Sequence, residues 1–144
     1  IVLDDWGTRI PFDNYKLVAG DLENNGKYRI ELFNAYGDTG KDPGLDINLL
    51  NFTKRVGITF TLKGIKATGD FKANIGFASS DWSFSNWGYT EGEGCIVNGD
   101  GTYTVTLNGA ATGANVFVVD IDGLSTANGG TDGIVSTIEA VRVE

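Results

Sequence analysis

Apolar residues recur at every second position in two segments of the chain. Val56, Ile58, Phe60 and Leu62 alternate with glycine and threonine, and residues 103–107 alternate tyrosine, valine and leucine with threonine. Successive side chains of a strand point to opposite faces, so both patterns predict strands with one buried face. No stretch of useful length shows a helical period. The chain is therefore constrained to an all-β fold.

Turn residues divide the rest of the chain into further short strands. The sequence predicts strands at 15–19, 28–36, 73–78, 115–121 and 134–143, and a short helix or turn at 46–53. The 21 glycines have no fixed period, which indicates many tight turns. Asn-Gly and Asp-Gly are strong hairpin signals, so Asn98-Gly99-Asp100-Gly101 predicts a hairpin between 96–98 and 102–108.

Eight to ten short strands at this spacing predict two packed antiparallel sheets, a β-sandwich of jelly-roll type. The 144 residues fit one domain, 1–144. The chain contains no methionine, and Ile1-Val2-Leu3-Asp4-Asp5 does not resemble a signal peptide. We therefore expect a single module cut from a longer precursor.

Charge and composition exclude several classes of function. The formal net charge is −8, which disfavours nucleic acid and anionic membrane surfaces but not neutral polysaccharides. The absence of histidine excludes Ser/His and Cys/His catalysis and imidazole metal ligation. The single cysteine, Cys95, cannot form an intrachain disulfide, and we expect a small buried apolar residue there.

Two tryptophans, Trp82 and Trp87, lie in the otherwise polar stretch 81–89. Polar neighbours are costly to bury, so this stretch favours an exposed surface that stacks on a flat, hydroxylated ligand such as a sugar chain. The two positions differ by an odd number, so in an unbroken strand one ring would enter the core. We favour a bulge or turn near Asn86 that leaves both rings exposed.

Other residues are candidates for ligand contact. Trp6 has acidic neighbours and a following glycine, which suit either an exposed contact or a lid on the sandwich. Tyr36 ends a predicted strand just before a glycine, a place that suits either a half-buried corner residue or a ligand contact. The loop 37–45 after it is placed to shape a rim. The candidate ligand-binding residues are Trp82, Trp87, Tyr36, Tyr89, Asn34, Asp81, Asn86 and Trp6.

Four sequence segments occur along the chain in the following order: Leu32-Phe33-Asn34-Ala35-Tyr36-Gly37-Asp38-Thr39, Val56-Gly57-Ile58-Thr59-Phe60-Thr61, Asp81-Trp82-Ser83-Phe84-Ser85-Asn86-Trp87-Gly88 and Gly99-Asp100-Gly101-Thr102-Tyr103-Thr104-Val105. Together they resemble the non-catalytic carbohydrate-binding β-sandwich modules of plant cell-wall hydrolases from anaerobic fibre-degrading bacteria. In those modules the position that matches Tyr36 is often aromatic, as it is here. The resemblance also implies that the paired tryptophans, Trp82 and Trp87, stack on β-1,4-linked glucan. It also implies β-glucan, xyloglucan or glucomannan as the target, and an attached glycoside hydrolase.

Two alternatives concern chemistry at carboxylates. A small glycoside hydrolase would need two facing carboxylates, for which Glu91 and Glu93 are the available pair, but a solvated acidic loop explains them better. A structural calcium ion could use oxygen ligands from Asp120 and Asp122, from Asp4 and Asp5, or from the loop 38–42. Surface acidity explains these residues equally well, and we predict no catalytic residue, no metal ligand and no cofactor.

A structural or adhesive immunoglobulin-like spacer is the remaining alternative, because it would share the strand pattern. It would not need two tryptophans in a polar stretch. We therefore predict a monomeric, secreted module, associated with a cellulosome or a free hydrolase, that binds neutral β-linked plant polysaccharides. Its covalent partner would be a catalytic domain of the parent protein.

Overall fold

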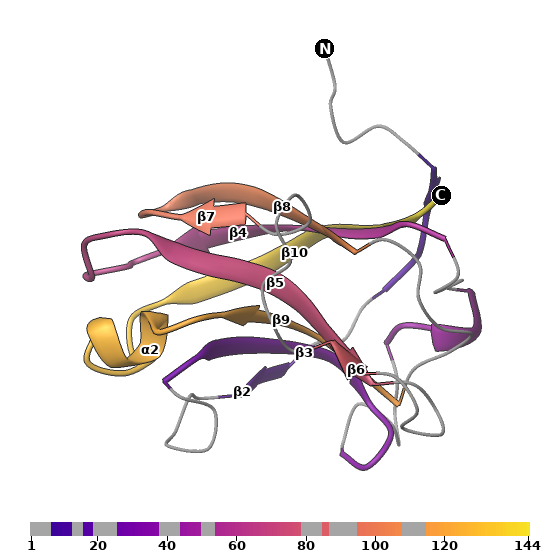
Figure 1. Cartoon of the computed structure of the whole chain (residues 1–144), viewed down its shortest axis with the longest axis horizontal. Helices are drawn as coiled ribbons and strands as arrows, with labels where there is room; N and C mark the ends of the chain where they lie inside the picture. Colours follow the sequence, from indigo (N-terminus) through magenta and orange to yellow (C-terminus); the bar gives the residue numbers. More distant parts are fainter. Residues whose placement is uncertain are drawn as a thin grey trace.

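The computed structural model describes residues 7–12, 16–18, 26–37, 44–49, 54–78, 85–86, 95–107 and 115–144, with the backbone alone at 16–18, 47 and 85–86. Two antiparallel sheets pack as layers of a β-sandwich (Figure 1). The four-stranded sheet has the order β1 (Thr8–Arg9), β10 (Val135–Val143), β4 (Val56–Lys63) and β8 (Gly101–Leu107).

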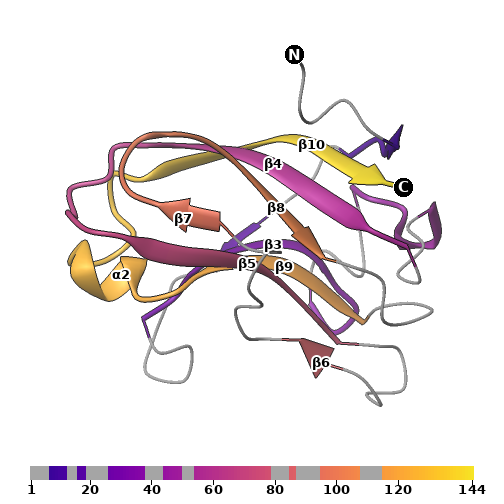
Figure 2. The ribbon, with the colours of Figure 1, turned by 45° about the horizontal axis from the view of Figure 1, so that its top comes forward.

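The second sheet has six strands. Its order is β2 (Lys16–Val18), β3 (Tyr28–Asn34), β9 (Val116–Ile121), β5 (Phe71–Ala78) and β6 (Ser85–Asn86), and β7 (Cys95–Val97) also pairs with β5. Two short helices complete the described elements: η1 (Ile47–Leu49) and α2 (Leu124–Ala127). Figure 2 shows α2 and β6 near opposite ends of this layer.

The alternating patterns form the core as predicted. Phe60 of β4 and the rings of Phe77 and Phe117 on the other sheet are fully buried between the layers. Burying each such ring contributes on the order of 2–3 kcal/mol. The strand β9 lies between β3 and β5 and is buried on both faces, as its continuous apolar run suggests.

The predicted hairpin between 96–98 and 102–108 is wrong. β7 pairs with β5 in one sheet, whereas β8 pairs with β4 in the other, so residues 98–100 cross between the layers. The turn residues do reverse the chain, and Tyr103 stabilises the crossing by donating a hydrogen bond to the carbonyl of Gly99 at 2.6 Å. Turn chemistry alone does not specify which sheet each flanking strand joins.

Hydrogen bonds link the crossing at residues 98–100 to the connection between β4 and β5. The Asp100 carboxylate accepts hydrogen bonds from the backbone amides of Ile65 (2.9 Å) and Gly64 (3.0 Å). These bonds hold the pKa of Asp100 below its ordinary value. Gly64 has φ +84°, and a Cβ there would lie 2.0 Å from the carbonyl oxygen of Gly133. This close approach requires glycine at position 64.

The remaining strand predictions are confirmed, with small shifts at their ends. The strand predicted at 28–36 ends at Asn34, and residues 35–37 form a turn. The helix or turn predicted at 46–53 contains the 3₁₀ helix Ile47–Leu49. The short helix α2 was not predicted, because four residues are too few to show a helical period.

Candidate functional site

Tyr36 is the most exposed aromatic residue among those that the structure describes. The residue is 69% exposed, on the turn that follows β3. A large ring in this position adds little to the core, because most of its surface stays in water. It is therefore available to stack on a ligand.

Hydrogen bonds fix the turn that carries Tyr36. The Tyr36 amide donates to Oδ1 of Asn34 at 3.0 Å, and the Gly37 amide donates to the Asn34 carbonyl at 3.0 Å. The Asn115 side-chain amide donates to the Tyr36 hydroxyl at 3.0 Å. The ring is thus held from the backbone and from its tip, so little conformational entropy is lost when a ligand stacks on it.

The same end of the sheet holds the short strand β6. The backbone amide of Ala35 donates to the backbone carbonyl of Asn115 (2.8 Å), and the backbone amide of Asn115 donates to the backbone carbonyl of Ala78 (2.7 Å). Ala78 is in turn the register partner of Ser85 in β6. The turn with Tyr36 and β6 therefore lie at one end of one sheet (Figure 1).

The separation across this end suits an extended ligand. β3 and β6 are three strand steps apart in the order β3-β9-β5-β6. At about 4.8 Å per step, the two strands are about 14 Å apart. A ligand that contacts both strands would therefore have to span about 14 Å.

The predicted site residues differ in what the structure says of them. Tyr36 is exposed and not a half-buried corner residue, its contact with a ligand stays a prediction, and Asn34 uses its side-chain oxygen to hold the turn. For Asn86 the structure describes the backbone, which pairs with Phe77. Five predicted residues lie outside the described residues: Trp6, Asp81, Trp82, Trp87 and Tyr89. Their exposure stays a prediction.

Asn115 is a residue that sequence reasoning did not find. It precedes β9, about 80 positions after Tyr36, and nothing in the local sequence indicates that the two side chains meet. The bulge in β3 between Glu31 and Phe33 shifts the register against β9. The pairing that follows aligns Asn34 with Val116 and so brings Tyr36 near Asn115.

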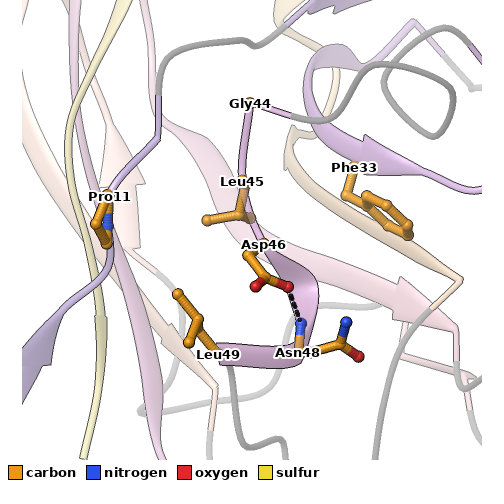
Figure 3. Close-up of a pocket in the computed structure, with 7 residues that line it drawn as sticks. All are labelled: Pro11, Phe33, Gly44, Leu45, Asp46, Asn48 and Leu49. Carbon is orange, nitrogen blue, oxygen red and sulfur yellow. Dashed lines mark hydrogen bonds between the residues drawn. The ribbon is translucent and has the colours of Figure 1, made fainter.

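A separate cavity of about 530 Å³ opens where the two sheets meet near β1. Its walls come from three segments far apart in the sequence, and the described lining residues are Pro11, Phe33, Gly44, Leu45, Asp46, Asn48 and Leu49. We call it the Leu45 groove. Figure 3 shows Leu45 and Leu49 on the side of Pro11, and the Asn48 side chain on the side of Phe33. Leu45 is buried and forms an isolated bridge with Phe12.

The Leu45 groove is mostly apolar, with polar groups from one short segment. The backbone amide of Asn48 donates to Oδ1 of Asp46 at 3.0 Å (Figure 3), and the backbone amide of Leu49 donates to the backbone carbonyl of Asp46 at 3.0 Å. These bonds set the orientation of the Asp46 carboxylate before any ligand arrives. Apolar lining with a few oriented polar groups is typical of small-molecule sites.

Asp120 and Asp122, the described acidic residues that were considered as calcium ligands, do not lie in a cluster of ligands. Asp120 is fully buried and forms a two-point ion pair with Arg29, at 2.6 Å from Nε and 3.0 Å from Nη2. Burial raises the pKa of Asp122. Within the described ranges, no group of three or more His, Cys, Asp or Glu could hold a metal ion. Asp4, Asp5 and the loop 38–42 lie outside the described residues, as do Glu91 and Glu93.

Cys95 is partly buried and packs against the core, close to the expectation for an apolar residue. Burial raises the pKa of its thiol to about 11. The thiol is therefore almost wholly protonated near neutral pH, and a thiolate nucleophile is disfavoured at this position.

Comparison with known proteins gives no relative: no family model, no curated protein and no solved structure matches this chain. In the part of the chain that the structure describes, no helix has the length and apolar character needed to cross a bilayer.

Proposed function

We propose that this chain is a non-catalytic carbohydrate-binding module that binds neutral β-linked glucans of plant cell walls. The ligand is β-1,4- or mixed-linked glucan, xyloglucan or glucomannan. Tyr36 and the tryptophans Trp82 and Trp87 stack on the sugar rings, and Asp81, Asn86, Tyr89 and Trp6 complete the surface. No metal or cofactor takes part in the binding.

The observation that carries this proposal is Tyr36. This aromatic residue is 69% exposed and lies at the sheet end that also holds β6. Hydrogen bonds to its backbone amide and its hydroxyl hold it in place. A pre-positioned ring offers apolar contact area to the C–H face of a sugar at a low entropic cost. An acidic chain with net charge −8 favours a neutral polymer over an anionic one.

The wider proposal concerns the fold and the parent protein. The strands alternate between sheets from β3 to β5 and from β7 to β10, which supports a jelly-roll arrangement. We propose a secreted, monomeric module joined to a glycoside hydrolase, free or in a cellulosome. Binding would raise the local concentration of the joined enzyme at the wall.

Affinity electrophoresis tests the proposal. Gels with xyloglucan, mixed-linkage β-glucan, glucomannan or xylan are run beside a gel without polysaccharide. At least one β-glucan gel should retard the wild-type protein, and Trp82→Ala or Trp87→Ala should abolish the retardation with nearly unchanged thermal stability. An immunoglobulin-like spacer predicts equal mobility in all gels, and release of reducing sugar from β-glucan would contradict the non-catalytic part.

A further inference from the structure

We propose that the Leu45 groove is a second binding site, which takes one neutral sugar ring. The site is separate from the surface around Tyr36, and it is not part of the sequence-based prediction. That the ring belongs to a cell-wall polysaccharide rests on the proposed function. That the groove takes a sugar ring rests on its own lining.

The size and lining of the groove fit a ring with an apolar face. A volume of about 530 Å³ falls within the range of ordinary small-molecule sites. Pro11, Leu49 and Phe33 supply carbon surface from different segments, and Leu49 is 52% exposed. An exposed leucine beside a cavity is apolar area that a ligand can cover.

The polar groups favour a hydroxylated ligand over a hydrocarbon. Asp46 lines the groove, and Oδ1 of its carboxylate accepts a hydrogen bond from the backbone amide of Asn48. The Asn48 side chain is exposed and carries both a donor and an acceptor. The Asp46 carboxylate can accept a hydrogen bond from one hydroxyl of a sugar ring. The Asn48 side-chain amide, two residues further on, can bind a neighbouring hydroxyl of the same ring.

Charge favours a neutral ligand over a cation. Asp46 is the one charged side chain among the described lining residues, and it is exposed to water. Water screens a single exposed carboxylate, so its attraction for a cation is small. Contact with the apolar walls and hydrogen bonds to hydroxyls then decide which ligand binds.

The groove is open on one side, since Pro11, Asp46 and Asn48 are all exposed. A ring seated there keeps one edge in water, so it can remain joined to a longer chain. The turn with Tyr36 begins two residues after Phe33. A branched polysaccharide could therefore place its main chain on Tyr36 and a side-chain sugar in the groove.

The test is a two-dimensional amide NMR titration of the whole chain with glucose, xylose and cellobiose, with p-cresol and glucosamine as competing ligand classes. The variants are Asn48→Ala and Leu49→Asp in the groove and Tyr36→Ala outside it. Neutral sugars should shift the amides of residues 44–49 and Phe33 in the wild type. The loss of one hydrogen bond in Asn48→Ala should weaken this binding about 3–10-fold. Leu49→Asp should abolish it, and Tyr36→Ala should leave it unchanged.

Several results would overturn the inference. Shifts at 44–49 with p-cresol but not with sugars would indicate an apolar site, and shifts with glucosamine alone that vanish in salt would indicate a cation site. Sugar shifts confined to residues 34–37 would overturn the second site and leave the proposed function intact. Sugar shifts at 44–49 in a protein that no polysaccharide gel retards would support the groove and contradict the proposed function.

Discussion

Replacing Tyr36 by alanine separates the roles of this ring in binding and in folding. A tyrosine offers about 200 Å² of surface, and with 69% of it exposed, about 140 Å² faces water and about 60 Å² is covered. At about 25 cal/mol per Å², the covered part contributes about 1.5 kcal/mol, and the exposed hydrogen bond to Asn115 adds about 0.5 kcal/mol. The free energy of unfolding should therefore fall by about 2 kcal/mol at most.

The effect on binding follows from the exposed area. A sugar ring stacked on one face covers about half of it, about 70 Å², which contributes about 1.8 kcal/mol. Tyr36→Ala should therefore raise Kd for the best β-glucan about 20-fold. Isothermal titration calorimetry measures Kd, and urea unfolding measures stability.

Tyr36→Phe is the matched control for this substitution. It keeps the ring but removes the hydroxyl that Asn115 contacts, so its Kd should stay within about threefold of the wild-type value. A folded Tyr36→Ala variant with wild-type Kd would refute the stacking role. A loss of more than about 4 kcal/mol of stability would show that the ring is mainly structural.

Three further predictions concern buried and titrating groups. Asp120→Ala leaves the partly exposed Arg29 without its two-point partner and should lower the unfolding free energy by about 3 kcal/mol in urea; a loss below about 1 kcal/mol would contradict the buried ion pair. The folded-state pKa of Asp100 is lowered, so its stabilising effect is present above the ordinary aspartate pKa and is lost as the pH falls through the folded value. The stability gap between wild type and Asp100→Asn should thus shrink between pH 7 and pH 2.5, and a gap constant with pH would contradict this reasoning. Burial raises the pKa of Cys95 to about 11, so iodoacetamide at pH 8 should label the native thiol far more slowly than the urea-unfolded one; equal rates would contradict the burial.

The period-two patterns predicted β4 and β8 because the apolar side chains on one face of each strand pack in the core. The other face of β8 is partly exposed, whereas Gly57 and Thr59 on the other face of β4 are buried as well. The doubly buried β9 was recognisable from its continuous apolar run. The hairpin prediction was wrong because residues 98–101 indicate that the chain reverses but do not indicate which sheet each flanking strand joins. Pairing depends on contacts far along the chain, which local turn residues do not encode.

The candidate site shows the same division. Its place before a glycine at the end of a strand marked Tyr36 as a candidate, but that place equally suits a half-buried corner residue, so the exposure of Tyr36 was not predictable from it. Its contact with Asn115 was not predictable either, because that contact depends on the bulge in β3 and the register with β9. The Leu45 groove joins Pro11, Phe33 and residues 44–49, so the expectation that the loop 37–45 shapes a rim could not by itself indicate this cavity.

Acrylamide quenching of the intrinsic fluorescence tests the binding surface most directly. The chain has three tryptophans, Trp6, Trp82 and Trp87, and they dominate the emission. Quenching is measured in the free protein, with saturating xyloglucan or mixed-linkage β-glucan, and with an α-glucan as control. We predict efficient quenching in the free protein and protection by a β-glucan but not by the α-glucan. Weak quenching without ligand, or equal quenching with every polysaccharide, would contradict an open aromatic surface that binds β-glucan.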